Sequence, residues 1–144
     1  MNNFDCLKLE NQLCFPLYAA SKEVIKKYKP YLDKYGLTYT QYIALMVLWN
    51  EREINVKQLG EKLFLDSGTL TPLLKKLESK GFIKRTRSLT DERNLMVSIT
   101  SDGDKLKENL ASIPSNVGKC VNLNEEEAKT LYTLLYKVLK STVD

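Results

Sequence analysis

One stretch in the middle of the chain constrains the fold more than any other. In LDSGTLTPLLKKLESKG, residues 65–81, four leucines recur at the spacing of one helical face: Leu70, Leu73, Leu74 and Leu77. Small, hydroxyl and cationic side chains lie on the other side. Proline removes a backbone N–H, which only the first turn of a helix can spare, so Pro72 predicts a helix that begins near residues 67–69. We expect this helix to bury its leucines and to expose a slim polar face.

The pattern changes from helical to extended after Gly81, the expected end of this helix. The runs FIKRTRS (82–88) and NLMVSIT (94–100) are typical of strands, and the polar LTDER between them predicts a hairpin. Other helices are expected at about 12–34, at 40–50, from the N-cap Asn55, at 101–112, and after a capping box of Asn124 and Glu127. This order is that of a winged helix-turn-helix, so the expected fold is mainly α with a small β-hairpin.

Composition excludes most enzyme chemistry. The 144 residues contain no histidine, and the three cysteines (Cys6, Cys14 and Cys120) show no C-x-x-C spacing. Nucleophiles paired with histidine, histidine acid–base catalysis and Cys/His zinc sites are therefore excluded, and the six glycines form neither a P-loop nor a dinucleotide-binding motif. We expect a protein that is not an enzyme and that holds no metal or other cofactor.

Length and hydropathy indicate a single domain, residues 1–144, in the cytoplasm. The chain is long enough to bury a core, and its longest apolar run, YIALMVLW at 42–49, is too short to span a bilayer. The first ten residues lack the basic stretch and the apolar core of a signal peptide. We therefore expect no membrane partner, and thiols that start reduced.

Basic charge is concentrated at the centre of the chain. Residues 56–93 hold nine basic and five acidic side chains, an excess of four that equals the formal charge of the whole chain, +4. A basic patch on a neutral frame indicates a polyanion partner, although a solvated lysine-rich face is the alternative.

Double-stranded DNA is the partner that the winged-helix order indicates, because a helix with a slim docking face fits the major groove. The residues of the helix expected to contact base edges or phosphates are Ser67, Gly68, Thr69, Thr71, Lys75 and Lys76. In the hairpin, Arg85 and Arg87 alternate onto one face, and Arg87 and Arg93 could reach phosphates or a narrow minor groove. An amphipathic core helix with a solvated outer face remains the alternative.

A cysteine near the N-terminus has the sequence context of a reactive thiol. In LENQLCFPLYAASKE, residues 9–23, Pro16 favours a helix start at about 12–15, which places Cys14 near the positive end of the helix dipole. A thiol ionises more readily there, and the thiolate attacks a peroxide O–O bond to become a sulfenic acid. Tyr18, one turn on, could donate a hydrogen bond to the sulfur. The alternative is that Cys14 is a small buried hydrophobe.

These motifs resemble one family. LDSGTLTPLLKKLESKGFIKRTRS followed by DERNLMVSIT, together with KLENQLCF and LTYTQY, is similar to the MarR family of winged-helix regulators, and specifically to its organic-hydroperoxide-sensing OhrR branch with the SarZ and MgrA types. The resemblance covers nearly the whole chain. It implies a homodimer on a pseudo-palindromic operator, with dimerisation helices at about 1–34 and 101–144 and a DNA-binding lobe at about 40–100. It also adds Asp91 to Arg93 as the D-x-R signature of the wing.

The resemblance assigns roles around Cys14 as well. It implies that Cys14 is the thiol oxidised by organic hydroperoxides, with Tyr18, Tyr28 and Tyr39 around it, the last two from the partner subunit. Cys120 lies in the region where some members carry a second cysteine that closes an intersubunit disulfide; otherwise Cys14 would bind a low-molecular-weight thiol. Pro16 departs from the family pattern beside the reactive position, where it can alter the local geometry and the reactivity of Cys14.

The expected function is therefore a redox-sensing transcriptional regulator, a repressor in the first instance, that loses operator affinity when Cys14 is oxidised. Two alternatives stay open. One is a regulator of the same family that responds to a small phenolic ligand, with Cys14 incidental. The other is a thiol peroxidase that uses Cys14 for turnover, although no recycling C-x-x-C is present.

Overall fold

The computed structural model describes residues 3–87, 89–90 and 94–143. Asp91 and Arg93 of the predicted interface lie outside this range. The elements before the sheet region are η1 (Asp5–Leu7), η2 (Leu9–Asn11), α1 (Cys14–Lys26), α2 (Lys29–Leu32), η3 (Asp33–Tyr35) and α3 (Tyr39–Glu51). They are followed by β1 (Glu53–Asn55), α4 (Val56–Leu63), α5 (Ser67–Ser79), β2 (Ile83–Arg87), β3 (Leu95–Ile99), α6 (Ser101–Leu110), α7 (Ile113–Gly118) and α8 (Glu125–Thr142).

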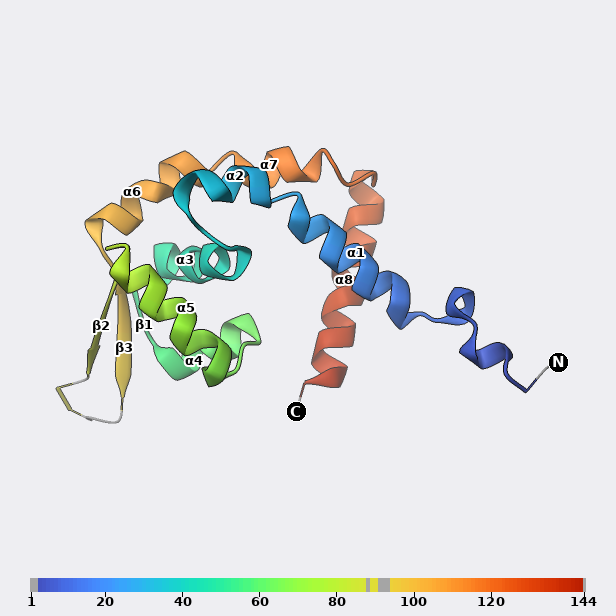
Figure 1. Cartoon of the computed structure of the whole chain (residues 1–144), viewed down its shortest axis with the longest axis horizontal. Helices are drawn as coiled ribbons and strands as arrows, with labels where there is room; N and C mark the ends of the chain where they lie inside the picture. Colours follow the sequence, from blue (N-terminus) through green and yellow to red (C-terminus); the bar gives the residue numbers. More distant parts are fainter. Residues whose placement is uncertain (1–2, 88, 91–93, 144) are drawn as a thin grey trace.

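The elements form a compact lobe and two helices that extend beside it (Figure 1). In the lobe, α3 lies between α4 and α5 below and α2, α6 and α7 above, and the sheet closes the outer end. The strand order is β1-β3-β2, with both pairs antiparallel. This arrangement confirms the predicted winged helix-turn-helix, in which α4 and α5 are the two helices of the motif and β2 and β3 form the wing.

Helix α5 has the predicted start and the predicted buried face. It begins at Ser67 because the Oδ1 atom of Asp66 accepts a hydrogen bond of 2.7 Å from the backbone N–H of Thr69. The chain turns away at Gly81, whose φ of +80° suits glycine. The leucines at 70, 73, 74 and 77 are all buried, in one core with residues of α3, α4, α6, α7 and the sheet. Pro72 lies beyond the first turn, and because it has no N–H it cannot make the α-helical hydrogen bond to the Gly68 carbonyl.

The two helices before α5 are also set by local signals. Thr38 and Gln41 form a capping box at the start of α3, in which each side chain bonds to the backbone of the other residue. Asn55 caps α4, as predicted, by accepting hydrogen bonds from the N–H groups of Lys57 and Gln58. These caps fix the entry of both helices into the core.

The structure differs from the predicted boundaries in three places. The helix expected at 12–34 breaks after Lys26, because Pro30 has no N–H to continue the ladder and instead lies in the first turn of α2. The helix expected at 101–112 ends at Leu110, and a separate α7 carries Pro114 in its own first turn. Strand β1, which the sequence did not predict, pairs Ile54 with Val97 of β3.

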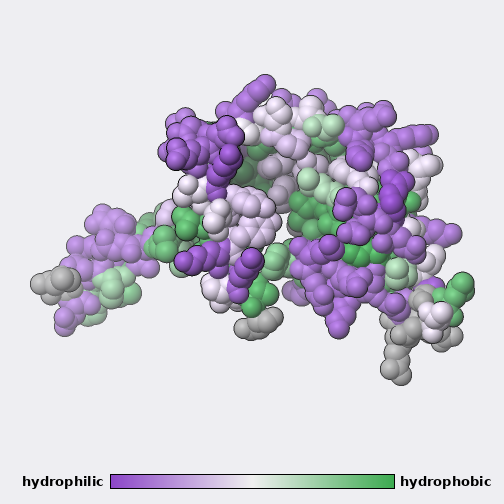
Figure 2. Space-filling model, turned by 180° about the vertical axis from the view of Figure 1, so that it is seen from behind, coloured by the Kyte–Doolittle hydropathy of each residue, from purple (hydrophilic) through white to green (hydrophobic). Residues whose placement is uncertain are grey.

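Helices α1 and α8 expose much of their apolar surface in the single chain. Neither contains a buried residue, although both carry large apolar side chains. Those on α8 that are exposed in the single chain are Leu131, Tyr132, Leu134, Leu135, Tyr136 and Val138. Figure 2 shows hydrophobic side chains at the surface along the N-terminal segment and between it and the lobe. Within the described residues, no helix has the length and the apolarity needed to cross a membrane.

Candidate functional site

The outer face of α5 has the form expected of a helix that docks in a groove. Ser67, Gly68, Thr69 and Thr71 are exposed along its first turns, and Lys75 and Lys76 are exposed further on. The buried leucines on the other side fix the rotation of the helix, so these six residues face solvent together. The structure therefore brings all six helix residues of the predicted interface onto one surface.

Electrostatics at the start of α5 follow from its cap. The hydrogen bond from the Thr69 backbone holds the pKa of the Asp66 carboxyl below its ordinary value, so Asp66 is ionised at neutral pH. Its negative charge lies at the positive end of the helix dipole, which it stabilises. A polyanion that approaches this end meets small and hydroxyl side chains, with the lysines one to two turns away.

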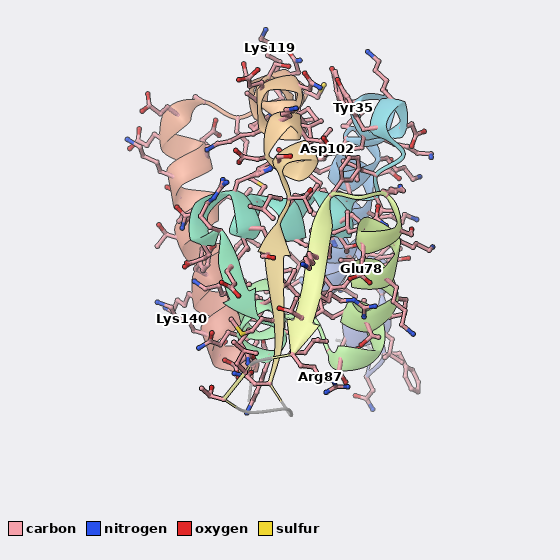
Figure 3. All side chains as sticks on the ribbon, turned by 90° about the vertical axis from the view of Figure 1, so that its left-hand side faces the viewer. Tyr35, Glu78, Arg87, Asp102, Lys119 and Lys140 are labelled. Atoms are coloured by element: carbon pink, nitrogen blue, oxygen red, sulfur yellow. The ribbon has the colours of Figure 1, made fainter. Side chains whose placement is uncertain are left out.

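The wing places its two described arginines differently. Arg87, the last residue of β2, is exposed and lies where the hairpin turns, at the end of the molecule opposite Tyr35 and Lys119 (Figure 3). Arg85 is half-buried, and its guanidinium bonds to the carboxylate of Glu78 on α5. Arg85 was predicted to contact DNA, but in the structure its guanidinium is already bonded to Glu78.

Sequence reasoning missed Glu78. It lies seven residues before Arg85, in the last turn of α5, and only the turn back from the helix into β2 brings the two side chains together. An acidic residue in a helix followed by a basic residue in the next strand was the one available signal.

Cys14 is the first residue of α1, as Pro16 predicted, and its side chain is exposed. No side chain caps this end of the helix, so no capping group competes for the N–H groups of the first turn, which can interact with a negative charge at Cys14. Pro16 falls within that first turn and takes up one position that has no intrahelical partner. The alternative of a small buried hydrophobe is not what the single chain shows, since the thiol faces solvent.

Tyr18 is also exposed on α1, and the ammonium of Lys22 lies 5.4 Å from the centre of its ring. This cation–π contact occupies one ring face. Lys22 was not predicted as part of the site.

Tyr28 and Tyr39 form a pair away from Cys14. Their ring centres are 4.8 Å apart in an edge-on arrangement, and Tyr42 packs against both. Burial, and secondarily the neighbouring Tyr28, raises the pKa of Tyr39, so its phenol keeps its proton and remains a hydrogen-bond donor. The length of α1 separates Cys14 from Tyr28 by roughly 20 Å at 1.5 Å per residue. The tyrosine pair is therefore too far from the Cys14 of its own chain to contact it.

The other two thiols are free and exposed. Cys120 follows α7, in the connection to α8, and its Sγ atom lies 3.8 Å from the carbonyl oxygen of Asn116. Cys6 belongs to the N-terminal turns, which the side chains of Asn11 and Gln12 hold by hydrogen bonds to the carbonyls of Asp5 and Cys6.

Comparison with known proteins gives consistent similarities. A family model described as transcriptional regulator SarA/Rot matches residues 26–110. The organic hydroperoxide resistance transcriptional regulator of Bacillus subtilis (strain 168) is 50% identical over 140 residues, 97% of this chain and 95% of that protein. The HTH-type transcriptional regulator SarZ of Staphylococcus aureus (strain USA300) is 50% identical over 136 residues, 94% of this chain and 92% of that protein.

Solved structures of AbfR, a protein of Staphylococcus epidermidis, are similar throughout. Reduced AbfR bound to DNA superimposes with a TM-score of 0.79 at 34% identity, covering 95% of each chain. Overoxidised AbfR bound to DNA gives 0.77 at 34% identity, covering 95% of this chain and 96% of AbfR. The disulfide-formed state gives 0.68 at 33% identity, covering 96% and 94%.

Proposed function

Since the chain belongs to the MarR-like family of SarA/Rot and OhrR-type transcriptional regulators, we propose that it is a DNA-binding regulator that senses organic hydroperoxides through Cys14. In this function the reduced dimer binds a pseudo-palindromic operator and oxidation releases it. The observation that carries the proposal is the combination, in one chain, of the exposed polar face of α5 and an exposed Cys14 at an uncapped helix start.

DNA binding uses α5 in the major groove and the wing beside it. The exposed hydroxyl side chains at the start of α5 approach base edges, and Lys75 and Lys76 reach the phosphates. Because a monomer offers a single recognition helix, an operator of two half-sites needs two copies related by a two-fold axis.

The second copy also completes the thiol site. Large apolar side chains of α1 and α8 are exposed in the single chain, and their burial against a second copy is the natural source of dimer stability. Dimerisation would bring the Tyr28 and Tyr39 phenols of one subunit to the Cys14 of the other. Phenol donors favour the thiolate, which is the form that reacts with a peroxide.

The chemistry at Cys14 is one oxygen transfer. The thiolate attacks the terminal peroxide oxygen, the O–O bond breaks, Cys14 becomes a sulfenic acid, and the alkoxide leaves as an alcohol after taking up a proton. The sulfenic acid then condenses with a second thiol, forming a disulfide and water. Cys120 of the other subunit or a low-molecular-weight thiol is the second thiol in this proposal.

The energetics favour the disulfide as the switch. Loss of one set of charge-assisted hydrogen bonds is worth about 1.5–3 kcal/mol, whereas a change from mostly bound to mostly released needs roughly 5 kcal/mol. AbfR supports this order, because its overoxidised form has been solved on DNA and it also has a disulfide-formed state. We therefore expect oxidation of Cys14 alone to weaken binding and the disulfide to abolish it.

A titration of DNA with variants tests the proposal. The probe is a duplex selected from a random-sequence library by the reduced protein, and cumene hydroperoxide is added with and without a small thiol. The unmodified protein should release the duplex, Cys14→Ser should keep it, and the matched control Cys6→Ser should behave like the parent. Release by Cys120→Ser only when the small thiol is present identifies Cys120 as the second thiol. Release by Cys14→Ser would disprove the sensing role.

A further inference from the structure

We propose that Arg85 is a positioning residue, held by Glu78, that sets the angle of the wing against the recognition helix, and that it is not a DNA contact. The proposal rests on the proposed function as a DNA-binding regulator and replaces the expectation for Arg85 drawn from sequence. Two observations support the proposal: the hydrogen bonds between Glu78 and Arg85, and the position of the pair between α5 and β2. The charges of the two residues then provide the test.

The bonding uses both oxygens of one carboxylate and three donors of one residue. Glu78 Oε1 accepts hydrogen bonds from Arg85 Nε at 3.1 Å and Nη2 at 2.9 Å, and Oε2 accepts one from the Arg85 backbone N–H at 3.0 Å. The two guanidinium donors converge on one carboxylate oxygen, which restricts the orientation of the guanidinium, and the bond from the backbone N–H holds the strand itself. The Arg85 side chain is 21% exposed and that of Glu78 is 36% exposed. The same bonds hold the pKa of Glu78 below its ordinary value, so the acid stays charged.

The pair lies where it controls an angle. At the near end of the hairpin, the Phe82 N–H bonds to the Leu77 carbonyl and the Thr100 hydroxyl bonds to the Gly81 carbonyl. The first bond attaches the start of β2 to α5, and the second attaches the end of β3 to the turn between α5 and β2. Arg85 lies further along β2, opposite Val97 of β3, so its bonds to Glu78 add a second point of attachment. With both attachments the direction of β2 relative to α5 is fixed, whereas with the first attachment alone β2 could rotate about its start.

The direction of β2 determines the position of Arg87, two residues after Arg85. Residues 85 and 87 lie on the same face of β2 because side chains alternate along a strand. The attachment at Arg85 therefore determines where Arg87, at the end of β2 in Figure 3, is presented relative to α5. Strand β1 holds β3 from the other edge of the sheet, and within the described residues the Glu78–Arg85 pair ties the outer strand β2 to the recognition helix at this distance from the turn.

The negative charge of Glu78 allows the two roles of Arg85 to be distinguished by the direction in which Glu78→Gln changes the affinity for DNA. If Arg85 bound phosphate, Glu78 would oppose DNA binding, and Glu78→Gln would free a cation, raise affinity and steepen the dependence on salt. If Glu78 positions the wing through Arg85, the same substitution must lower affinity although it removes a negative charge. We expect a loss of about three- to tenfold, the scale of a half-exposed charge-assisted contact.

The experiment compares Glu78→Gln with Glu108→Gln, which makes the same charge change on an exposed residue of α6. Affinity is measured on the selected duplex and on a shortened duplex that ends before the segment contacted by the wing. The expected result is a loss for Glu78→Gln on the long duplex, little change on the short one, and no loss for Glu108→Gln on either. Higher affinity, unchanged affinity, or an equal loss on both duplexes would overturn the proposal.

A charge swap covers the case in which Glu78→Gln disturbs the fold. Glu78→Arg combined with Arg85→Glu keeps an ion pair at the same place, so it should regain part of the affinity that Arg85→Glu alone loses. If the swap binds as weakly as Arg85→Glu, the positive charge at position 85 contacts DNA directly and the proposal is wrong. A parent protein that binds no duplex would instead refute the proposed function, and this is seen without any variant.

Discussion

Replacing Leu131 and Leu135 of α8 with alanine should separate the dimer. The two side chains lie one turn apart and are 44% and 37% exposed in the single chain. Full burial of a leucine side chain is worth about 1.5–3 kcal/mol, so covering the exposed part of each contributes roughly 1 kcal/mol. Because a two-fold dimer contains both substitutions twice, the variant loses about 4 kcal/mol, roughly a thousandfold in the dimer dissociation constant.

Sedimentation velocity over nanomolar to micromolar protein concentrations measures this change. Leu89→Ala is the matched control, because Leu89 is an exposed leucine of the wing hairpin and does not belong to α8. The control should sediment like the parent, and the double variant should become monomeric at concentrations where the parent is dimeric. A double variant that dissociates at the same concentration as the parent would show that α8 does not form the interface.

Three further predictions concern the lobe. Lys76→Ala should weaken binding to all duplexes and reduce the slope of log affinity against log salt concentration by about one unit, as loss of a phosphate contact does. Thr69→Ala should instead change the sequence preference in a binding selection. If both variants bind like the parent, α5 does not dock in the major groove as proposed. Leu77 is fully buried, so Leu77→Ala should lower the free energy of unfolding in urea by about 2–5 kcal/mol. Hydrogen bonds lower the pKa values of Asp66 and Glu78, so the stability they contribute is present above their ordinary values of 3.8 and 4.5 and is lost as pH falls through the lowered folded values. Urea unfolding in acid should therefore show a loss of stability that is smaller in Asp66→Asn and Glu78→Gln.

The parts of the fold that could be predicted are those encoded by neighbouring residues. The cap at Asn55, the stop at Gly81 and the leucine stripe of α5 each act within one element, so periodicity and capping rules were sufficient. Strand β1 has three residues and exists because Ile54 pairs with Val97, far along the chain, so no local pattern indicated it. The break before α2 did have a local signal, Pro30, which the long apolar pattern of the first helix obscured.

The same division applies to the candidate site. The place of Cys14 at the start of α1 followed from Pro16, and the exposed face of α5 followed from its buried one. The pairing of Arg85 with Glu78 did not follow from the position of Arg85 in a basic strand, because the hydrogen bonds between them depend on how a helix and a strand meet. Long-range contacts between side chains are what a single sequence leaves undetermined.

Control of DNA binding by a disulfide at Cys14 can be tested in one titration. Organic hydroperoxide is added stepwise to the unmodified protein on its duplex, and each sample is divided for two measurements: the fraction of DNA bound, and the fraction of Cys14 present as thiol, sulfenic acid or disulfide by alkylation and mass spectrometry. We expect DNA release to follow the disulfide fraction of Cys14 and to lag behind the loss of free thiol. Complete release while Cys14 remains a thiol, or full binding with Cys14 entirely in a disulfide, would contradict this expectation.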